Sequence, residues 1–119
     1  MSIHSSRTGA KLFSVEGKIP EAGFGFSFAV VANPTKDLRS ALAVGSPYFD
    51  DTRGRVELIS LRNGAVVATL DGLAPKDQFG HAITAVGDLD GNGTTEIAVG
   101  AIGAPAAVEL GRVTVFTIH

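Results

Sequence analysis

The sequence predicts an all-β protein built from a repeated unit, and three observations carry that prediction. First, similar segments recur at a fixed distance, as when Phe24-Gly25 returns 55 residues later as Phe79-Gly80. Second, 15 glycines and 5 prolines punctuate short apolar runs along the chain. Third, several runs alternate apolar and polar residues, a pattern typical of half-buried strands. A period of this size indicates a repeat architecture.

The repeat keeps its register through the first half of each unit and then shifts by two residues. The aligned segments are Gly17–Gly25 with Gly72–Gly80, Leu42–Gly45 with Ile97–Gly100, and Gly54-Arg55-Val56 with Gly111-Arg112-Val113. The last pair is 57 residues apart, whereas the first two pairs are 55 apart. The sequence therefore predicts two structurally equivalent units.

Residues 23–72 hold four predicted strands. They are Phe26–Ala32, Ala41–Gly45, Arg55–Leu61 and Ala65–Leu70. Turn signals separate them, and Asn63-Gly64 between two apolar runs is a strong hairpin signal because both residues tolerate positive φ. Four antiparallel strands per repeat of this length describe one blade of a β-propeller.

Residues 77–119 provide three strands of a second blade. They are Ala82–Val86, Glu96–Gly100 and Arg112–Ile118. The expected fourth strand matches residues 8–17 instead, since that segment aligns with residues 63–72. We therefore treat residues 1–119 as one two-bladed unit, and expect residues 8–17 to pair with Arg112–Ile118 of another chain.

Two blades cannot close a ring alone, so the strand count predicts a homo-oligomer. Propellers contain roughly four to eight blades, which allows a dimer, trimer or tetramer of two-bladed chains. A trimer or tetramer is favoured over a dimer, with the trimer first.

Composition excludes several classes of protein. With 45% hydrophobic and 18% charged residues among 119, disorder is excluded. A net charge of −2 gives no electrostatic basis for binding nucleic acid, and no apolar run is long enough for membrane insertion. The first residues lack the apolar region of a signal peptide.

One loop carries metal-ligand chemistry. Oxygen-bearing side chains occupy alternate positions along it: Asp88, Asp90, Asn92, Thr94 and Glu96. Interposed glycines let the backbone turn tightly, Thr94 can offer its carbonyl, and an all-oxygen set on a flexible loop suits Ca²⁺. The alternative is a solvated turn without metal. We expect one calcium ion here.

The matching loop of the first unit has lost most of these ligands. Its corresponding residues are Asn33, Thr35, Asp37, Arg39 and Ala41. One carboxylate remains and an arginine stands two residues from it, so we expect no metal at this loop.

A second candidate site lies between the second and third strands of the first blade. It combines aromatic, acidic and basic side chains: Tyr48, Phe49, Asp50, Asp51 and Arg53. A structural turn packed on a neighbouring blade is the favoured interpretation, and a ligand site is the alternative.

Three motifs together resemble the FG-GAP repeat of integrin α-subunit propellers. They are Phe79-Gly80, Gly87-Asp88-Leu89-Asp90-Gly91-Asn92-Gly93 and Val99-Gly100-Ala101, and the first unit repeats the frame as Phe24-Gly25 and Val44-Gly45. The resemblance implies calcium in the loop between the first two strands of a blade, on the face opposite most ligand sites. It also implies that the Tyr48–Arg53 loop lies on the ligand face and that the protein is extracellular or at the cell surface.

The chain departs from that family in having two blades where seven are usual. In addition, only one of its two equivalent loops keeps the expected calcium ligands. No nucleophile elbow, phosphate loop or dinucleotide fingerprint is present. We therefore expect a non-enzymatic, calcium-stabilised module that binds protein or carbohydrate. The alternatives are an accessory piece of a larger secreted hydrolase, or a designed or excised propeller fragment without a ligand.

Overall fold

The chain forms nine strands and one helical turn among the residues that the structure describes. The computed structural model describes residues 2–4, 8, 11–14, 16–17, 22–35, 38–89, 91, 93–103 and 111–117. The elements are β1 (Ser2–His4), β2 (Lys11–Ser14), β3 (Ser27–Thr35), β4 (Leu38–Ser46), α1 (Phe49–Thr52), β5 (Arg55–Ser60), β6 (Val66–Asp71), β7 (Ala82–Gly87), β8 (Glu96–Ala101) and β9 (Arg112–Phe116).

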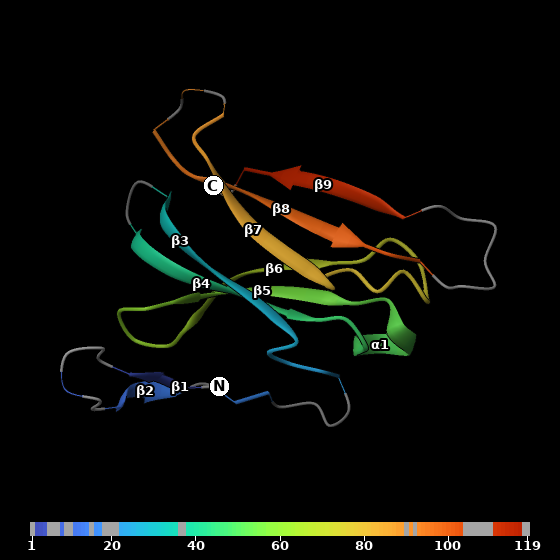
Figure 1. Ribbon diagram of the computed structural model, residues 1–119, viewed down its shortest axis with the longest axis horizontal. Helices are drawn as coiled ribbons and strands as arrows, with labels where there is room; N and C mark the ends of the chain where they lie inside the picture. The colour runs from blue at the N-terminus through green and yellow to red at the C-terminus, as the bar shows by residue number, and fades with distance from the viewer. Residues whose placement is uncertain are drawn as a thin grey trace.

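Two antiparallel sheets form the body of the molecule, as Figure 1 shows. One has four strands in the order β3-β4-β5-β6, and the other has three in the order β7-β8-β9. The predicted all-β fold with antiparallel blades is therefore confirmed, and the seven predicted strands of these two sheets lie where the sequence placed them. Neither β1 nor the turn α1 was predicted from the sequence.

The sequence repeat is also a repeat of backbone hydrogen bonds. The Gly25 N–H donates to the Gly45 carbonyl at 3.1 Å, and the equivalent Gly80 N–H donates to the Gly100 carbonyl at 3.1 Å. Strand register repeats as well, since Gly45 faces Val56 in one sheet and Gly100 faces Val113 in the other. The two-residue shift therefore lies in the connection between the second and third strands of each sheet.

The main core lies between the two sheets. Its buried residues alternate along the strands, as a period of two requires when one face is covered. They are Val31, Ala41, Ala43, Val56 and Leu58 from the first sheet, and Phe79, Ile97, Val99 and Ala101 from the second unit. A smaller cluster of Leu42, Val44 and Ile59, with Phe24 and Leu61 packed against it, lies on the opposite face of the four-stranded sheet.

Glycines let the second unit approach the first closely. Gly54 pairs with Phe79 in an isolated parallel bridge, and a Cβ at Gly54 would overlap the Phe79 backbone. A Cβ at Gly45 would likewise overlap the Gly80 carbonyl. Gly45 and Gly54 therefore allow backbone contact between the first unit and the Phe79-Gly80 pair of the second.

The N-terminal strands form a separate two-stranded sheet, in which β2 pairs with β1. Parts of the predicted outer strand, residues 8–17, lie outside the described residues. The expected pairing of this segment with Arg112–Ile118 involves a second chain, and it stays a prediction.

Candidate functional site

The predicted calcium loop connects β7 to β8 and is held by its own carboxylates. Asp88 Oδ2 accepts a hydrogen bond from the Gly93 N–H at 2.8 Å, and Glu96 Oε1 accepts one from the Leu89 N–H at 2.8 Å. Gly91 and Gly93 have φ of +76° and +86°, in the region that favours glycine. These bonds fold the chain back on itself between the first and last carboxylates of the predicted set.

The described ligand candidates differ in exposure. Asp88 is exposed, whereas Thr94 and Glu96 are buried. Asp90 and Asn92 lie outside the described residues, and among the described residues no group of three or more His, Cys, Asp or Glu side chains gathers closely enough to hold a metal. Oxygen donors at both ends of a tight glycine turn nevertheless fit the chemistry of a hard cation such as Ca²⁺.

The matching loop of the first unit contacts the predicted calcium loop directly. The Asn33 carbonyl accepts a hydrogen bond from the Thr95 N–H at 3.0 Å, and Asn33 has φ of +47°. Asp37 lies outside the described residues. Ala41, which aligns with Glu96 of the second unit, is buried in the core. One backbone hydrogen bond therefore joins the two equivalent loops.

The loop predicted as a possible ligand site has an unusual backbone. Asp50, Asp51 and Thr52 have φ of +51°, +52° and +61°, a region that side chains other than glycine rarely adopt. Carbonyls of this loop accept hydrogen bonds from the segment that leads into the second unit. The pairs are Lys76 N–H to Asp51 at 3.0 Å, Gln78 N–H to Thr52 at 2.8 Å and Phe79 N–H to Arg53 at 3.1 Å.

The side chains of this loop diverge. Tyr48 lies edge-on to Phe26 at 5.8 Å between ring centroids, and Phe26 lies 4.9 Å from the His81 ring. Asp50 bonds Arg53 at 3.2 Å, and Asp51 bonds Lys76 at 2.5 Å. The structure thus brings Asp50 and Arg53 together, whereas Tyr48 packs against Phe26, the residue before β3. These contacts support the structural-turn interpretation.

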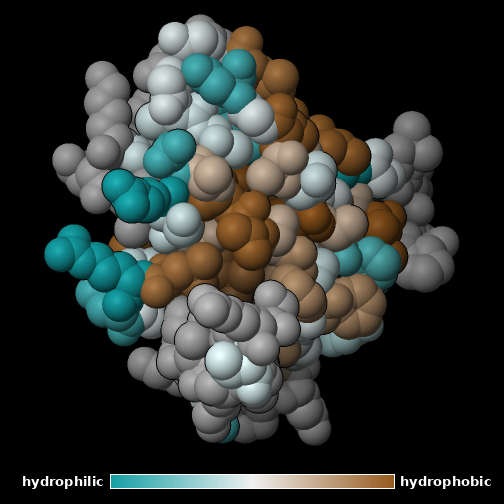
Figure 2. All heavy atoms as spheres, turned by 60° about the vertical axis from the view of Figure 1, so that its left-hand side comes forward, coloured by the Kyte–Doolittle hydropathy of each residue, from teal (hydrophilic) through white to brown (hydrophobic). Residues whose placement is uncertain are grey.

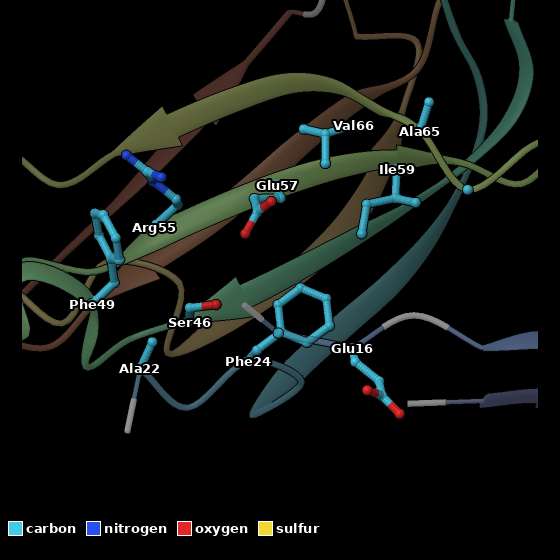
Figure 3. Close-up of a pocket in the computed structure, with 12 residues that line it drawn as sticks. Glu16, Ala22, Phe24, Ser46, Phe49, Arg55, Glu57, Ile59, Ala65 and Val66 are labelled. Atoms are coloured by element: carbon cyan, nitrogen blue, oxygen red, sulfur yellow. The ribbon is translucent and has the colours of Figure 1, made fainter. Parts of the chain in front are cut away.

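Phe49 lies on the other side of the loop, next to a hollow of about 310 Å³. Figure 3 shows Phe49 beside Arg55, and Glu57, Phe24 and Ile59 around the space. The Arg55 guanidinium stacks 3.8 Å from the Phe49 ring centroid and pairs with Asp71 at 2.6 Å. The hydrogen bonds that Arg55 donates to the Asp71 carboxylate raise the pKa of Arg55 above its ordinary value.

Sequence reasoning missed a buried ion pair at the junction of the sheets. Arg112 donates through both terminal nitrogens to the carboxylate of the buried Asp77, and the Leu73 N–H donates to the same carboxylate at 3.2 Å. The pair ties β9 to the segment between the units. The available signal was a difference between repeats, because Ala22 occupies the position equivalent to Asp77.

The two antiparallel sheets and the loop between β7 and β8 are those of a β-propeller blade repeat that has a candidate metal loop between its first two strands. A family model described as FG-GAP repeat matches residues 79–116. The chain is also similar to integrin alpha-V from Gallus gallus, with 31% identity over 111 residues, covering 85% of this chain and 11% of that protein. The resemblance stated from the sequence is confirmed: this chain carries an FG-GAP repeat.

The similarity spans a small part of the integrin's length, 11%. It therefore establishes the kind of repeat and leaves the activities of that longer protein as proposals for this chain. Among the described residues, no helix is long and apolar enough to cross a membrane.

Proposed function

We propose that the chain is a non-enzymatic, calcium-binding propeller module that binds a protein or carbohydrate ligand outside the cell or at its surface. Asp88, Asp90, Asn92 and Glu96 supply side-chain oxygens to one Ca²⁺, and Thr94 supplies its carbonyl. The ion offsets repulsion among three carboxylates held on one turn.

The observation that supports the calcium proposal is the loop of the FG-GAP match, with glycines at positive φ and a buried carboxylate at its end. Burial of a carboxylate is costly unless hydrogen bonds or a cation compensate its charge. Glu96 accepts one loop N–H bond, and a calcium ion would compensate the charge further.

Isothermal titration calorimetry tests the proposal. We expect one calcium ion per chain, and we expect Glu96→Gln to weaken binding strongly while Mg²⁺ competes poorly. Two equivalent ions per chain, or none at millimolar calcium, would contradict the proposal that one loop binds calcium and the matching loop does not.

The ligand proposal rests on family likeness and on the exposed polar side chains of the α1 loop, Asp50 and Asp51. A glycan array and a panel of extracellular matrix proteins, each probed with wild type and with an Asp50→Asn, Asp51→Asn double variant, test it. Binding that requires calcium and is unaffected by the double variant would place the ligand elsewhere on the module.

We also propose that the chain assembles as a homo-oligomeric ring of two-bladed subunits, with trimer or tetramer favoured. Support comes from exposed apolar side chains on both sheets, namely Phe28 and Val30 of β3 and Val113 and Val115 of β9. Figure 2 shows hydrophobic residues gathered in the middle of one side of the molecule. The mass of the native assembly by light scattering tests the proposal.

A further inference from the structure

The turn between β5 and β6 contains a dipeptide whose two residues can react with each other. Asn63 is exposed and is followed by Gly64. A glycine in this position leaves its backbone nitrogen unshielded by a Cβ, so the nitrogen can reach the amide carbon of the asparagine side chain. An added Cβ at Gly64 would have no atom within 4 Å, and Figure 1 shows the turn projecting from the end of the four-stranded sheet. Water therefore has access to both reacting groups.

A hydrogen bond within the turn orients the side-chain amide for this reaction. Asn63 Oδ1 accepts a hydrogen bond from the Ala65 N–H at 3.0 Å. Such a bond curls the side chain back over the residues that follow it, which brings Cγ toward the intervening Gly64 nitrogen. The same N–H would stabilise the negative charge that develops on Oδ1 when the Gly64 nitrogen adds to Cγ.

One hydrogen bond opposes the reaction. The Gly64 N–H donates to the Ser60 carbonyl at 2.8 Å, and this bond must open before the nitrogen can lose its proton. Its acceptor is a neutral carbonyl, and a hydrogen bond to a neutral acceptor is weaker than one to a charged acceptor. The two strands can stay paired while this bond opens, because their ladder continues from Ile59 and Val66.

The other two asparagines of the chain are less able to react. Asn33 precedes Pro34, which has no N–H to supply the attacking nitrogen. Asn92 precedes Gly93 and lies outside the described residues, but the Gly93 N–H donates to the Asp88 carboxylate at 2.8 Å. A carboxylate holds an N–H more strongly than a neutral carbonyl does, and its negative charge disfavours loss of the proton. The same Asn-Gly sequence therefore occurs twice in unequal surroundings.

We propose that Asn63 is a site of spontaneous deamidation and that it reacts ahead of Asn92. The Gly64 nitrogen forms a bond to Cγ of Asn63, the bond from Cγ to the amide nitrogen breaks, and ammonia leaves with the proton of the Gly64 nitrogen. Water then opens the cyclic imide at either carbonyl and yields aspartate or isoaspartate. Nothing is oxidised or reduced, and each event makes the formal net charge of −2 more negative by one.

The isoaspartate product changes the length of the turn as well as its charge, because it inserts one methylene into the main chain. Two hydrogen bonds hold the present turn, from the Ser60 N–H to the Ala65 carbonyl and from the Gly64 N–H to the Ser60 carbonyl, both at 2.8 Å. Among the described strands, β6 lies at the edge of its sheet and pairs with β5 alone. A longer turn is therefore expected to loosen β6 first.

Incubation of the whole chain at neutral to mildly alkaline pH, followed by peptide mass spectrometry, measures all three asparagines in one sample. A calcium chelator is present throughout, so the outcome does not depend on the calcium proposal. In the folded chain we expect Asn63 to deamidate several-fold faster than Asn92, while Asn33 stays intact. In urea, where the surroundings of each asparagine are lost, we expect the Asn63 and Asn92 rates to become similar.

Two variants separate the chemistry from its effect on the turn. Gly64→Ala shields the nitrogen with a Cβ and should slow deamidation of Asn63 several-fold without changing that of Asn92. Asn63→Asp adds the charge without the methylene, so the amides of β6 should exchange hydrogen as in wild type. The isolated isoaspartate form should exchange faster at the same amides.

A folded chain in which Asn63 reacts no faster than Asn92 would overturn the proposal. The same ratio of the two rates in folded and in urea-unfolded protein would also overturn it, because the surroundings would then have no influence. An Asn63 rate unchanged in Gly64→Ala would exclude the cyclic imide. Unchanged hydrogen exchange in the isoaspartate form would contradict the expected loosening of β6.

Discussion

At the scale of single residues, glycines decide where one blade can touch the next. Gly54 has φ of +90° and lies against the Phe79 backbone. A glycine is therefore needed there both for the backbone conformation and for the lack of a Cβ. Gly64, in the β5–β6 turn, has φ of +76° but has no atom within 4 Å of an added Cβ. Comparing Gly54 with Gly64 therefore distinguishes the cost of steric overlap between the two units from the cost of the backbone conformation alone.

We expect Gly54→Ala to destabilise the fold by about 3 kcal/mol, because overlap typically costs about 1–3 kcal/mol and a left-handed backbone about 1–2. Gly64→Ala should cost only the second amount, about 1–2 kcal/mol. Urea unfolding measures both. Equal losses would mean that the Phe79 contact relaxes without penalty.

The buried ion pair of Asp77 and Arg112 gives a second prediction at this scale. Removing one partner of a buried pair costs about 3–5 kcal/mol, and we expect Asp77→Ala to fall near the low end since Arg112 is partly exposed. The matched control is Asp71→Ala, whose pair with Arg55 is more exposed and should be worth less than about 1 kcal/mol. Similar losses in urea unfolding would contradict this ranking.

At the scale of elements, the proposed calcium loop is joined to the first sheet by the Thr95–Asn33 hydrogen bond. Loss of calcium should therefore disturb the loop first and the contact between the two sheets second. Hydrogen exchange at the Thr95 amide, measured with calcium and with a chelator, would report this coupling.

Stability should depend on calcium through one loop only. Ligand linkage adds about 2.7 kcal/mol when free calcium is a hundred times its dissociation constant. Asp90→Ala should remove most of the calcium-dependent rise in melting temperature, and the control Asp37→Ala, in the degenerate loop, should leave it unchanged. A rise that persists in Asp90→Ala would exclude this loop as the main site.

At the scale of the whole molecule, the N-terminal strand bears on the proposed ring. By the repeat, β2 is equivalent to β6, which pairs with β5 at the edge of the four-stranded sheet. In an assembled ring, β2 of one chain would therefore lie beside β9 of its neighbour. This arrangement would complete a four-stranded second blade and cover its unpaired edge.

Deletion of residues 1–17 should abolish the ring and promote aggregation, because an edge strand with unpaired backbone groups becomes a template for other chains. Light scattering and melting temperature check the outcome. A truncated chain with the mass and stability of wild type would show that the N-terminal strands are dispensable for assembly.

The repeat, the strands of both sheets and the candidate ligand residues could be predicted from the sequence. These features are local: alternation of apolar residues, turn residues such as Asn63-Gly64, and spacing of carboxylates each act within a few residues. The 55-residue period then related the two units, because equivalent sequences form equivalent backbones.

Which face of each sheet is covered, and by which segment, became visible in the folded structure. The Asp77–Arg112 pair joins residues far apart in the chain. The hydrogen bonds between the α1 loop and residues 76–79 join two irregular segments, which no periodic sequence pattern reveals. Likewise, Val56 and Val113 occupy equivalent positions in similar sequences, yet one is buried and the other exposed. Burial depends on the neighbour that a face meets, and a strand's own sequence does not specify that neighbour.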